Sequence, residues 1–415
     1  MRKFCSITGF AISFLFCSFI CEAKTIFVGP NRQIHTITEG LATAESGDTV
    51  NVDKAIYKEG NINITKNIYL RGINYPVVDG ENKYNIFTIH ANGATLDGFR
   101  IQHGGRSETQ DLAGVVIQDS YHVTVINNIL DDTNFGIYSQ HSTACTIKNN
   151  RITAYGTNEV QSGNGIHCWR SDSLLIIGNI IQGHRDGLYF EFVTNTLVWR
   201  NQSRKNVRYG IHFMFSHHDT YISNIFEGNE SGVAVMFTHN IQMYNNFFLD
   251  NWGAAAYGIL LKEITDSYIT GNHFIKNTTA IQMEGCSRNF ILKNSFLNNG
   301  FAIKISASSA TNEISNNNFI GNTFDVGTNG TLVLNTFNSN YWDKYEGYDL
   351  ARDGIGDVPY HPVSMYSMII ETNPAALMLF RSIIVSLLDK SEKILPGITP
   401  ENLKDETPLM RPLRL

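Results

Sequence analysis

The segment RYGIHFMFSHHD, from Arg208 to Asp219, contains three histidines and one methionine within twelve residues. Imidazole and thioether groups together are ligands that suit copper, and Cu(I) especially. A second methionine, Met236, and a further histidine, His239, follow in the segment GVAVMFTH. These residue types predict a soft-metal site if the fold brings the two segments side by side.

An internal repeat supplies such an arrangement. Each unit contains short alternating strands separated by Asn, Gly and Ser turns, with no helical pattern between them. We therefore predict an all-β fold, a right-handed parallel β-helix in which coils of roughly 22 residues stack at about 4.8 Å. Segments of the form GIHFMFS recur at spacings of 22, 29, 22, 23, 22, 26, 22 and 22 residues, beginning at Gly114, Gly136, Gly165, Gly187, Gly210, Gly232, Gly258, Ala280 and Ala302.

An asparagine recurs in every unit of this repeat. An inward asparagine at each turn can bond the backbone of the next coil, so these residues predict a stacked amide ladder. The ladder positions are Asn128, Asn150, Asn179, Asn201, Asn224, Asn246, Asn272, Asn294 and Asn317.

Strand alternation predicts which side chains leave the core. The residue after each repeat glycine is Ile, Leu or Val and faces inward, so the second and fourth residues face outward. His212 and Met214 then share an outward face, and Met236 occupies the column of Met214 one coil further, about 5 Å away. His217 and His239 fall at equivalent places in adjacent turns. We predict these five residues as metal ligands. The alternatives are an apolar face covered by another segment, and solvated turn histidines.

Two further groups suggest other chemistry. The turn GHRDG contains His184 and Asp186, which fit either general acid–base machinery or a structural turn network. Parallel β-helices often bind polysaccharides in an outward groove, and Trp169, Tyr189 and Glu191 would suit sugar stacking and acid chemistry. The alternative function is therefore a carbohydrate-active enzyme, such as a polysaccharide lyase, hydrolase or epimerase. No second acid is positioned by strand phase to pair with Glu191.

The loop DLARDGIGD contains Asp349, Asp353 and Asp357. Their spacing resembles a calcium-binding loop without the full EF-hand pattern. Calcium is therefore a second candidate metal here, and the alternative is a Gly-rich turn capped by carboxylates.

The chain divides into three parts. Residues 1–23 have a positive start, an apolar run and a cleavage site after Ala23, which predict a secretory signal peptide; an N-terminal membrane anchor is the alternative. Residues 24–345 form the β-helix domain. Residues 346–415 contain the acidic loop and a helix predicted over 374–390, apolar on most faces. This last part either caps the final coil, as repeat proteins require, or docks onto a partner.

Composition excludes two classes of protein. The formal net charge is −6, which does not fit a nucleic-acid binder. Three of the six cysteines lie in the predicted signal peptide, and Cys145, Cys168 and Cys286 remain. Their wide spacing forms neither a metal motif nor a disulfide framework, so the core must stabilise the exported protein.

Several long motifs occur in register between His184 and Pro362. They are GHRDGLYFEFV, RYGIHFMFS, GVAVMFT, NWGAAAYGILLKEI and NYWDKYEGYDLARDGIGDVPY. Together they resemble the NosD family of periplasmic copper-processing proteins for nitrous oxide reductase. The N-terminal coils match mainly the general β-helix pattern.

The resemblance implies an exported protein that is not itself an enzyme. NosD-like proteins associate with an ABC transporter, which consists of a membrane permease and a cytoplasmic ATPase. They work with a lipoprotein copper chaperone to assemble the copper centres of nitrous oxide reductase. The resemblance therefore implies a periplasmic location, at the membrane through the transporter. It implies no particular ligand set, so the five predicted ligands rest on spacing.

Overall fold

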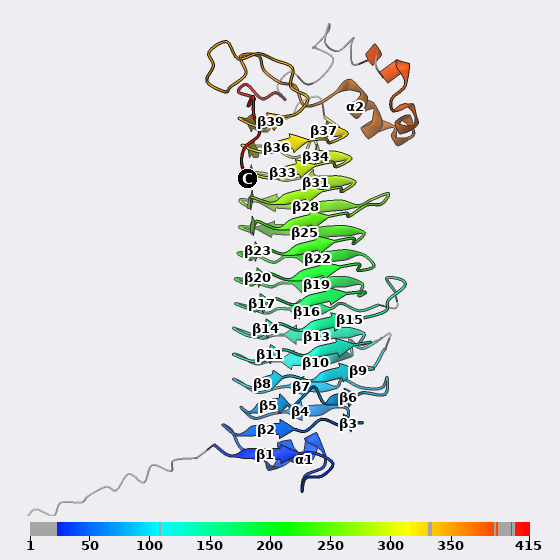
Figure 1. Ribbon diagram of the computed structural model, residues 1–415, viewed down its shortest axis with the longest axis vertical. Coiled ribbons are helices and arrows are strands. Elements are labelled where there is room, and N and C mark those ends of the chain that lie inside the picture. The colour runs from blue at the N-terminus through cyan, green and yellow to red at the C-terminus, as the bar shows by residue number, and fades with distance from the viewer. Residues whose placement is uncertain are drawn as a thin grey trace, which may run out of the picture.

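The computed structural model describes residues 23–107, 109–160, 162–330, 334–385, 387–388, 400 and 403–415. The predicted signal peptide lies outside these residues except for its last position. Three parallel sheets wind around one core and form a tall column of stacked coils (Figure 1). The predicted parallel β-helix is therefore confirmed.

From β4 onward each coil contributes one strand to each sheet, in the chain order sheet C, sheet A, sheet B. Sheet A contains β1 (Thr25–Val28), β2 (Thr49–Val52), β5 (Tyr69–Gly72), β8 (Thr95–Asp97), β11 (Thr124–Ile126), β14 (Thr146–Lys148), β17 (Leu175–Ile177), β20 (Leu197–Trp199), β23 (Thr220–Ile222), β26 (Gln242–Tyr244), β29 (Tyr268–Thr270), β32 (Phe290–Leu292), β35 (Glu313–Ser315) and β38 (Thr336–Asn338). Sheet B contains β3 (Ile56–Tyr57), β6 (Val77–Asp79), β9 (Arg100–Gln102), β12 (Ile129–Asp131), β15 (Arg151–Thr153), β18 (Ile180–Gln182), β21 (Gln202–Arg204), β24 (Ile225–Glu227), β27 (Phe247–Leu249), β30 (His273–Ile275), β33 (Ser295–Leu297), β36 (Asn318–Ile320) and β39 (Tyr341–Trp342). Sheet C contains β4 (Ile62–Ile64), β7 (Phe87–Ile89), β10 (Ala113–Gln118), β13 (Phe135–Gln140), β16 (Ile166–Trp169), β19 (Asp186–Glu191), β22 (Tyr209–Met214), β25 (Ser231–His239), β28 (Tyr257–Thr265), β31 (Thr279–Glu284), β34 (Phe301–Ile305) and β37 (Phe324–Thr328).

The repeat glycines lie where consecutive coils approach most closely. A Cβ at Gly187 would come 2.7 Å from the carbonyl oxygen of Gly210, and a Cβ at Gly210 would come 2.5 Å from that of Gly232. Inside the column, equivalent side chains stack coil on coil. One such stack has ring centroids 4.1 to 5.4 Å apart and runs through Phe226, Phe248, Phe274, Phe296, Phe319 and Trp342.

The predicted asparagine ladder is present and fully buried. The amide oxygen of each asparagine accepts the backbone N–H of the asparagine one coil earlier, as between Asn201 and Asn224 (2.9 Å). A second ladder, which the sequence analysis did not predict, follows the corner between sheets B and C. It runs through Asn206, Asn229, Asn251, Asn277, Asn299 and Asn322. Both ladders hold equivalent residues in register from coil to coil.

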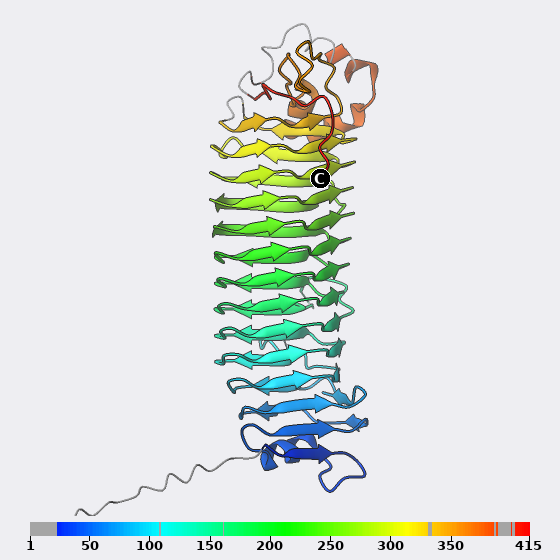
Figure 2. The same ribbon diagram turned by 60° about the vertical axis from the view of Figure 1, so that its left-hand side comes forward.

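Both ends of the column are covered. The short helix α1 (Ile37–Thr43) packs under the first coils, with Thr36 as its N-cap. At the other end, the C-terminal residues run back along the last coils (Figure 2). The carboxylate of Asp405 accepts from the backbone and side-chain amides of Asn340, and it therefore terminates the first ladder.

The helical segment near the C-terminus differs from the helix predicted over 374–390. The structure has an α-helix earlier, α2 (Met365–Thr372), which packs on β37, and then a 3-10 helix, η1 (Pro374–Leu379). The pyrrolidine ring of Pro374 begins the second helix, because it removes a backbone donor that a continuous helix would need. Residues 386, 389 and 390 of the predicted helix lie outside the described ones.

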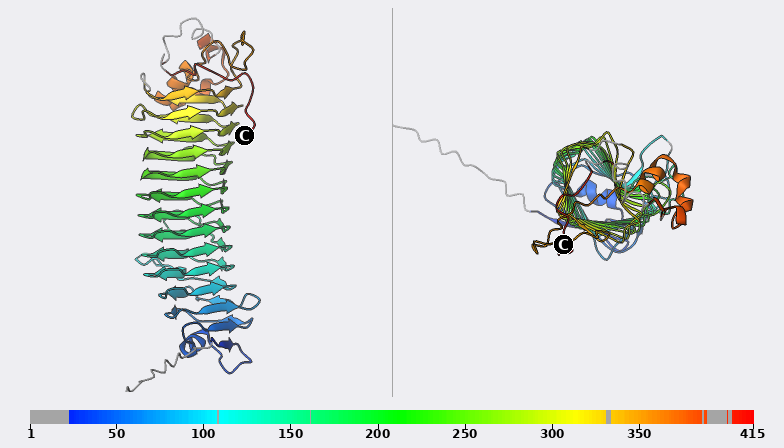
Figure 3. Two further views of the ribbon diagram at one scale, coloured as in Figure 1. Left: turned by 90° about the vertical axis from the view of Figure 1, so that its left-hand side faces the viewer. Right: turned by 90° about the horizontal axis from the view of Figure 1, so that it is seen from above.

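The helical segment projects sideways from the column (Figure 3). Several of its apolar side chains are exposed. Met378 is 90% and Ile383 is 80% exposed. Among the described residues, no helix combines the length and apolarity that crossing a bilayer requires.

Candidate functional site

The structure places the two outward methionines side by side. Strands β22 and β25 pair in parallel, with Met214 opposite Met236 and His212 opposite Ala234. Both methionines are half-buried on the outer face of sheet C. The predicted adjacency is therefore confirmed, while the role of these residues as ligands stays a prediction.

His212 is more enclosed than strand alternation suggested. The residue is only 7% exposed, because the rings of Tyr189 and Tyr209 each lie 5.1 Å from its imidazole. Its Nε2 atom is buried and has no hydrogen-bond partner within the described part of the chain. The ring therefore lies on the predicted outward face of the strand but is covered by neighbouring side chains.

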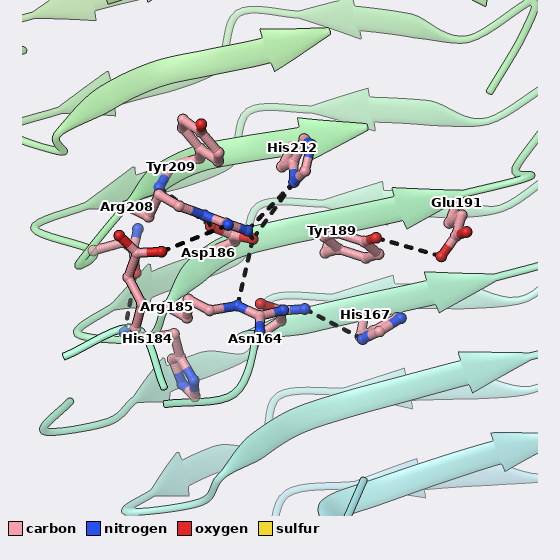
Figure 4. A network of polar contacts seen from close by, with 12 residues as sticks. Asn164, His167, His184, Arg185, Asp186, Tyr189, Glu191, Arg208, Tyr209 and His212 are labelled. Carbon is pink, nitrogen blue, oxygen red and sulfur yellow. Dashed lines mark hydrogen bonds and ion pairs between the residues drawn. The ribbon is translucent and has the colours of Figure 1, made fainter. Parts of the chain in front are cut away.

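A buried ion pair lies next to His212 (Figure 4). Asp186, fully buried, accepts from Arg208 Nε at 2.9 Å and from Arg208 Nη2 at 2.6 Å. The Nδ1 atom of His212 is 3.8 Å from the same carboxylate. Burial acts to raise the pKa of Asp186, but hydrogen bonds from His212 and Arg208 outweigh it and hold the pKa below its ordinary value. Asp186 is therefore an ionised carboxylate that is paired with Arg208 through two hydrogen bonds.

The remaining residues of the turn GHRDG also take part in a structural network. The backbone N–H of His184 donates to the side chain of Asn206 and so joins the second ladder. Burial lowers the pKa of His184 to about 4. A carboxylate engaged by arginine and a buried neutral imidazole favour the turn-network interpretation over acid–base machinery.

An aromatic column continues from His212 toward the N-terminus. His167 lies between the rings of Tyr138 and Tyr189, at centroid distances of 4.6 and 4.7 Å. Burial lowers the pKa of His167 to about 3 and raises that of Tyr189 to about 12. The Tyr189 hydroxyl donates to Glu191 at 3.3 Å. His167 and Tyr189 therefore both stay neutral near neutral pH.

The structure also brings His217 and His239 together. Their rings stack at 3.9 Å, and the backbone N–H of His239 donates to His217 Nδ1 at 3.3 Å. Burial and the neighbouring His239 lower the pKa of His217. In the described ranges, no three His, Cys, Asp or Glu residues are grouped so that they could hold a metal ion.

Three exposed phenylalanines border the methionine pair and were not singled out from the sequence. Phe192, Phe215 and Phe237 follow the outward residue of three consecutive coils and stack at 5.4 and 5.2 Å. Each has a positive φ between 50° and 54°, which is rare for bulky side chains. At this corner, other coils carry Asp119, His141, Arg170, Glu263 and Gly285. The phenylalanine that follows the outward residue in these three consecutive coils is the sequence signal that could have revealed this row of rings.

The aspartates of the acidic loop act as caps. Asp349 accepts the backbone N–H groups of Asp353 and Gly354, and Asp357 accepts that of Leu350. These contacts fit the capped-turn interpretation, and calcium stays an untested prediction.

Two parts of the chain are similar to described protein families. Residues 26–181 match the model of the right-handed β-helix region, and residues 154–347 match that of the periplasmic copper-binding protein NosD. The chain is therefore a parallel β-helix, of which the middle and C-terminal coils are similar to a family described as periplasmic copper-binding proteins. Two relatives carry the name "probable ABC transporter binding protein NosD". The one from Pseudomonas aeruginosa is 28% identical over 85% of this chain and 86% of its own length. The one from Stutzerimonas stutzeri is 25% identical over 85% of both chains. Over most of its length the chain is therefore similar to proteins named NosD.

Solved structures of other proteins share the fold. The Dettilon tailspike protein aligns with a TM-score of 0.56 at 12% identity, over 71% of this chain and 65% of its own. The family 28 exopolygalacturonase of Yersinia enterocolitica aligns with a TM-score of 0.54 at 9% identity, over 76% and 78%. At such identities the likeness concerns the fold alone, whereas the NosD relatives are named as binding proteins.

Proposed function

We propose that this protein binds Cu(I) transiently on the outer face of sheet C and hands it on for assembly of the copper centres of nitrous oxide reductase. The observation that carries the proposal is the register of β22 and β25, which sets two thioethers on adjacent coils beside His212. Two sulfur ligands and one imidazole form a donor set that suits Cu(I) and discriminates against magnesium and calcium.

The neighbouring pair His217 and His239 fits a second position for the ion. Both lie a few residues beyond the methionines on the same coils, and the stacked rings leave His217 Nε2 outside the backbone hydrogen bond that occupies Nδ1. We assign this pair to the place where copper enters the surface. A lipoprotein copper chaperone is the proposed donor.

The C-terminal part, residues 346–415, is the proposed attachment to an ABC transporter permease and its ATPase. Its helical segment exposes a contiguous run of apolar side chains, including Met378 and Ile383, far from the copper face. Large exposed apolar surfaces usually mark interaction sites. Export by the signal peptide and this attachment would hold the protein at the periplasmic side of the membrane. The role is that of a carrier and scaffold rather than of an enzyme.

Anaerobic titration of the mature protein with Cu(I), in competition with a chromophoric chelator, tests the site. We expect stoichiometric binding by the wild-type protein and its loss in the double variant Met214→Ala/Met236→Ala. Met378→Ala is the matched control, because it removes an exposed thioether on the helical segment and should leave binding unchanged. Unchanged affinity in the double variant would exclude the methionine pair as the site.

His217→Asn/His239→Asn separates the two positions. If this pair only receives the ion, the variant slows transfer from a Cu(I)-loaded donor but leaves the equilibrium affinity unchanged. Loss of equilibrium binding in this variant, with binding retained in the methionine variant, would reverse the assignment.

A further inference from the structure

We infer that Asp186 and Arg208 position the imidazole of His212, so that His212 presents Nε2 as a lone-pair donor beside Met214. The inference rests on the proposed function, since it assigns the residues that orient one ligand of the same site. Asp186 and Arg208 are positioning residues and would not touch the metal ion.

The geometry fixes one side of the ring and leaves the other side unengaged (Figure 4). On the Nδ1 side lie Asp186 Oδ2 at 3.8 Å and Arg208 Nη2 at 3.5 Å. On the opposite side, Nε2 is buried and finds no hydrogen-bond partner among the described residues. The aromatic contacts with Tyr189 and Tyr209 limit rotation of the ring between these two surroundings.

Hydrogen-bond chemistry selects one tautomer in this environment. A guanidinium group only donates, so the carboxylate of Asp186 is the neighbour that can accept a proton from Nδ1–H. With the proton on Nδ1, the Nε2 lone pair is free for a metal ion. The other tautomer could accept from Arg208 at Nδ1, but it would bury an N–H at Nε2 without an acceptor. A carboxylate behind a ligating imidazole is a common means of fixing its tautomer and orientation.

The repeat provides an internal comparison. His167 occupies the column of His212 two coils earlier, through the register His167, Tyr189, His212. Its Nδ1 atom faces the side-chain amide of Asn164 at 3.2 Å, and Trp169 stands where Met214 stands. In this part of the column, the carboxylate therefore accompanies the histidine that has a methionine beside it.

The charge at Asp186 is also unusual for its place in the coil. The paired position is Tyr209 in the next coil and Ser231 in the one after. A buried ion pair contributes little net stability compared with apolar residues of similar volume. Its presence in this coil fits a positioning role better than a role in stabilising the column.

The experiment uses the full mature protein, the variant Asp186→Asn, and Ag⁺ and Cu(I) as metal probes. Nitrogen NMR of the metal-free protein reports which ring atom of each imidazole carries the proton, and His212→Asn assigns the relevant signal. We expect His212 to be protonated on Nδ1 in the wild-type protein and to shift toward Nε2–H in Asp186→Asn. Affinity for both metal probes should then fall about 10- to 100-fold. The His167 signal should not change.

Asp172→Asn is the matched control. Asp172 is a half-buried carboxylate, which accepts from Thr194 and Asn195 at a different corner, so its variant should change neither the His212 tautomer nor the affinity. An Nε2–H tautomer in the wild-type protein would overturn the inference without any variant, even if Asp186→Asn fails to fold. An unchanged tautomer in Asp186→Asn would overturn it as well. If the wild-type protein binds no Cu(I), the proposed function fails, whereas the NMR result still decides the positioning role.

Discussion

Replacing Asn224 by alanine should destabilise the column strongly, because it removes a central rung of the first ladder. The Asn224 amide oxygen accepts from the backbone N–H and the side chain of Asn201, at 2.9 and 3.1 Å. Its Nδ2 atom donates to the carbonyl of Val198 at 2.9 Å and to the amide oxygen of Asn246 at 3.0 Å. Asn224 is fully buried, so water does not replace these partners.

The magnitude follows from the groups left behind. The Asn201 N–H loses its acceptor and the Val198 carbonyl loses a donor. Each buried polar group left unsatisfied costs about 1–3 kcal/mol, so the variant should lose about 2–6 kcal/mol of unfolding free energy.

Urea unfolding followed by circular dichroism measures this change, provided that the m-value stays constant between variants. Gln242→Ala is the matched control, since Gln242 is an exposed polar residue on the neighbouring strand β26 and should change the free energy by less than about 0.5 kcal/mol. A loss below about 1 kcal/mol in Asn224→Ala would refute the view that the ladder holds the coils together.

Three other outcomes are expected. Burial raises the pKa of Asp219 well above its ordinary value. The protonated acid therefore stabilises the fold below its unfolded pKa, and this contribution is lost as pH rises through the folded pKa. Asp219→Asn should raise the melting temperature at pH 8 and not near pH 3, and equal shifts at both pH values would contradict this. Gly187→Ala would drive its Cβ into Ser203 Oγ, across the interior of the same coil, and should cost about 1–3 kcal/mol in urea unfolding, whereas Gly253→Ala makes an ordinary 3.6 Å contact and serves as control. Met378→Ser/Ile383→Ser should reduce co-purification with the transporter permease while Cu(I) affinity stays unchanged, and undiminished co-purification would remove this segment from the proposed interface.

The fold was predictable because a solenoid repeats its physical requirements in every coil. The glycine at Gly210 recurs because the next coil leaves no room for a Cβ, and Asn224 recurs because each coil needs its backbone amide paired. The pairing of Met214 with Met236 was predictable for the same reason, since the register never slips between β22 and β25.

The features that the sequence did not reveal depend on neighbours that break the repeat. Alternation predicts the direction of His212 but not its enclosure, which arises from Arg208 and Tyr209 folding over it. The buried pair of Arg208 with Asp186 joins residues 22 positions apart that occupy non-equivalent places in their coils. Helix α2 begins at a serine N-cap in a segment without the coil repeat, so no periodic signal marked it.

The number of stacked coils also sets the distance between the copper face and the helical segment. From β25, which carries Met236, four coil steps lead to β37, on which α2 packs. At about 4.8 Å per step, the copper face stands about 19 Å from the coil beneath the helical segment. Insertion or deletion of a whole coil would preserve every ladder bond elsewhere, but it would move the copper face relative to the helical segment by about 4.8 Å. The number of coils between the two ends is therefore a dimension on which selection can act, separately from the sequence of any single coil.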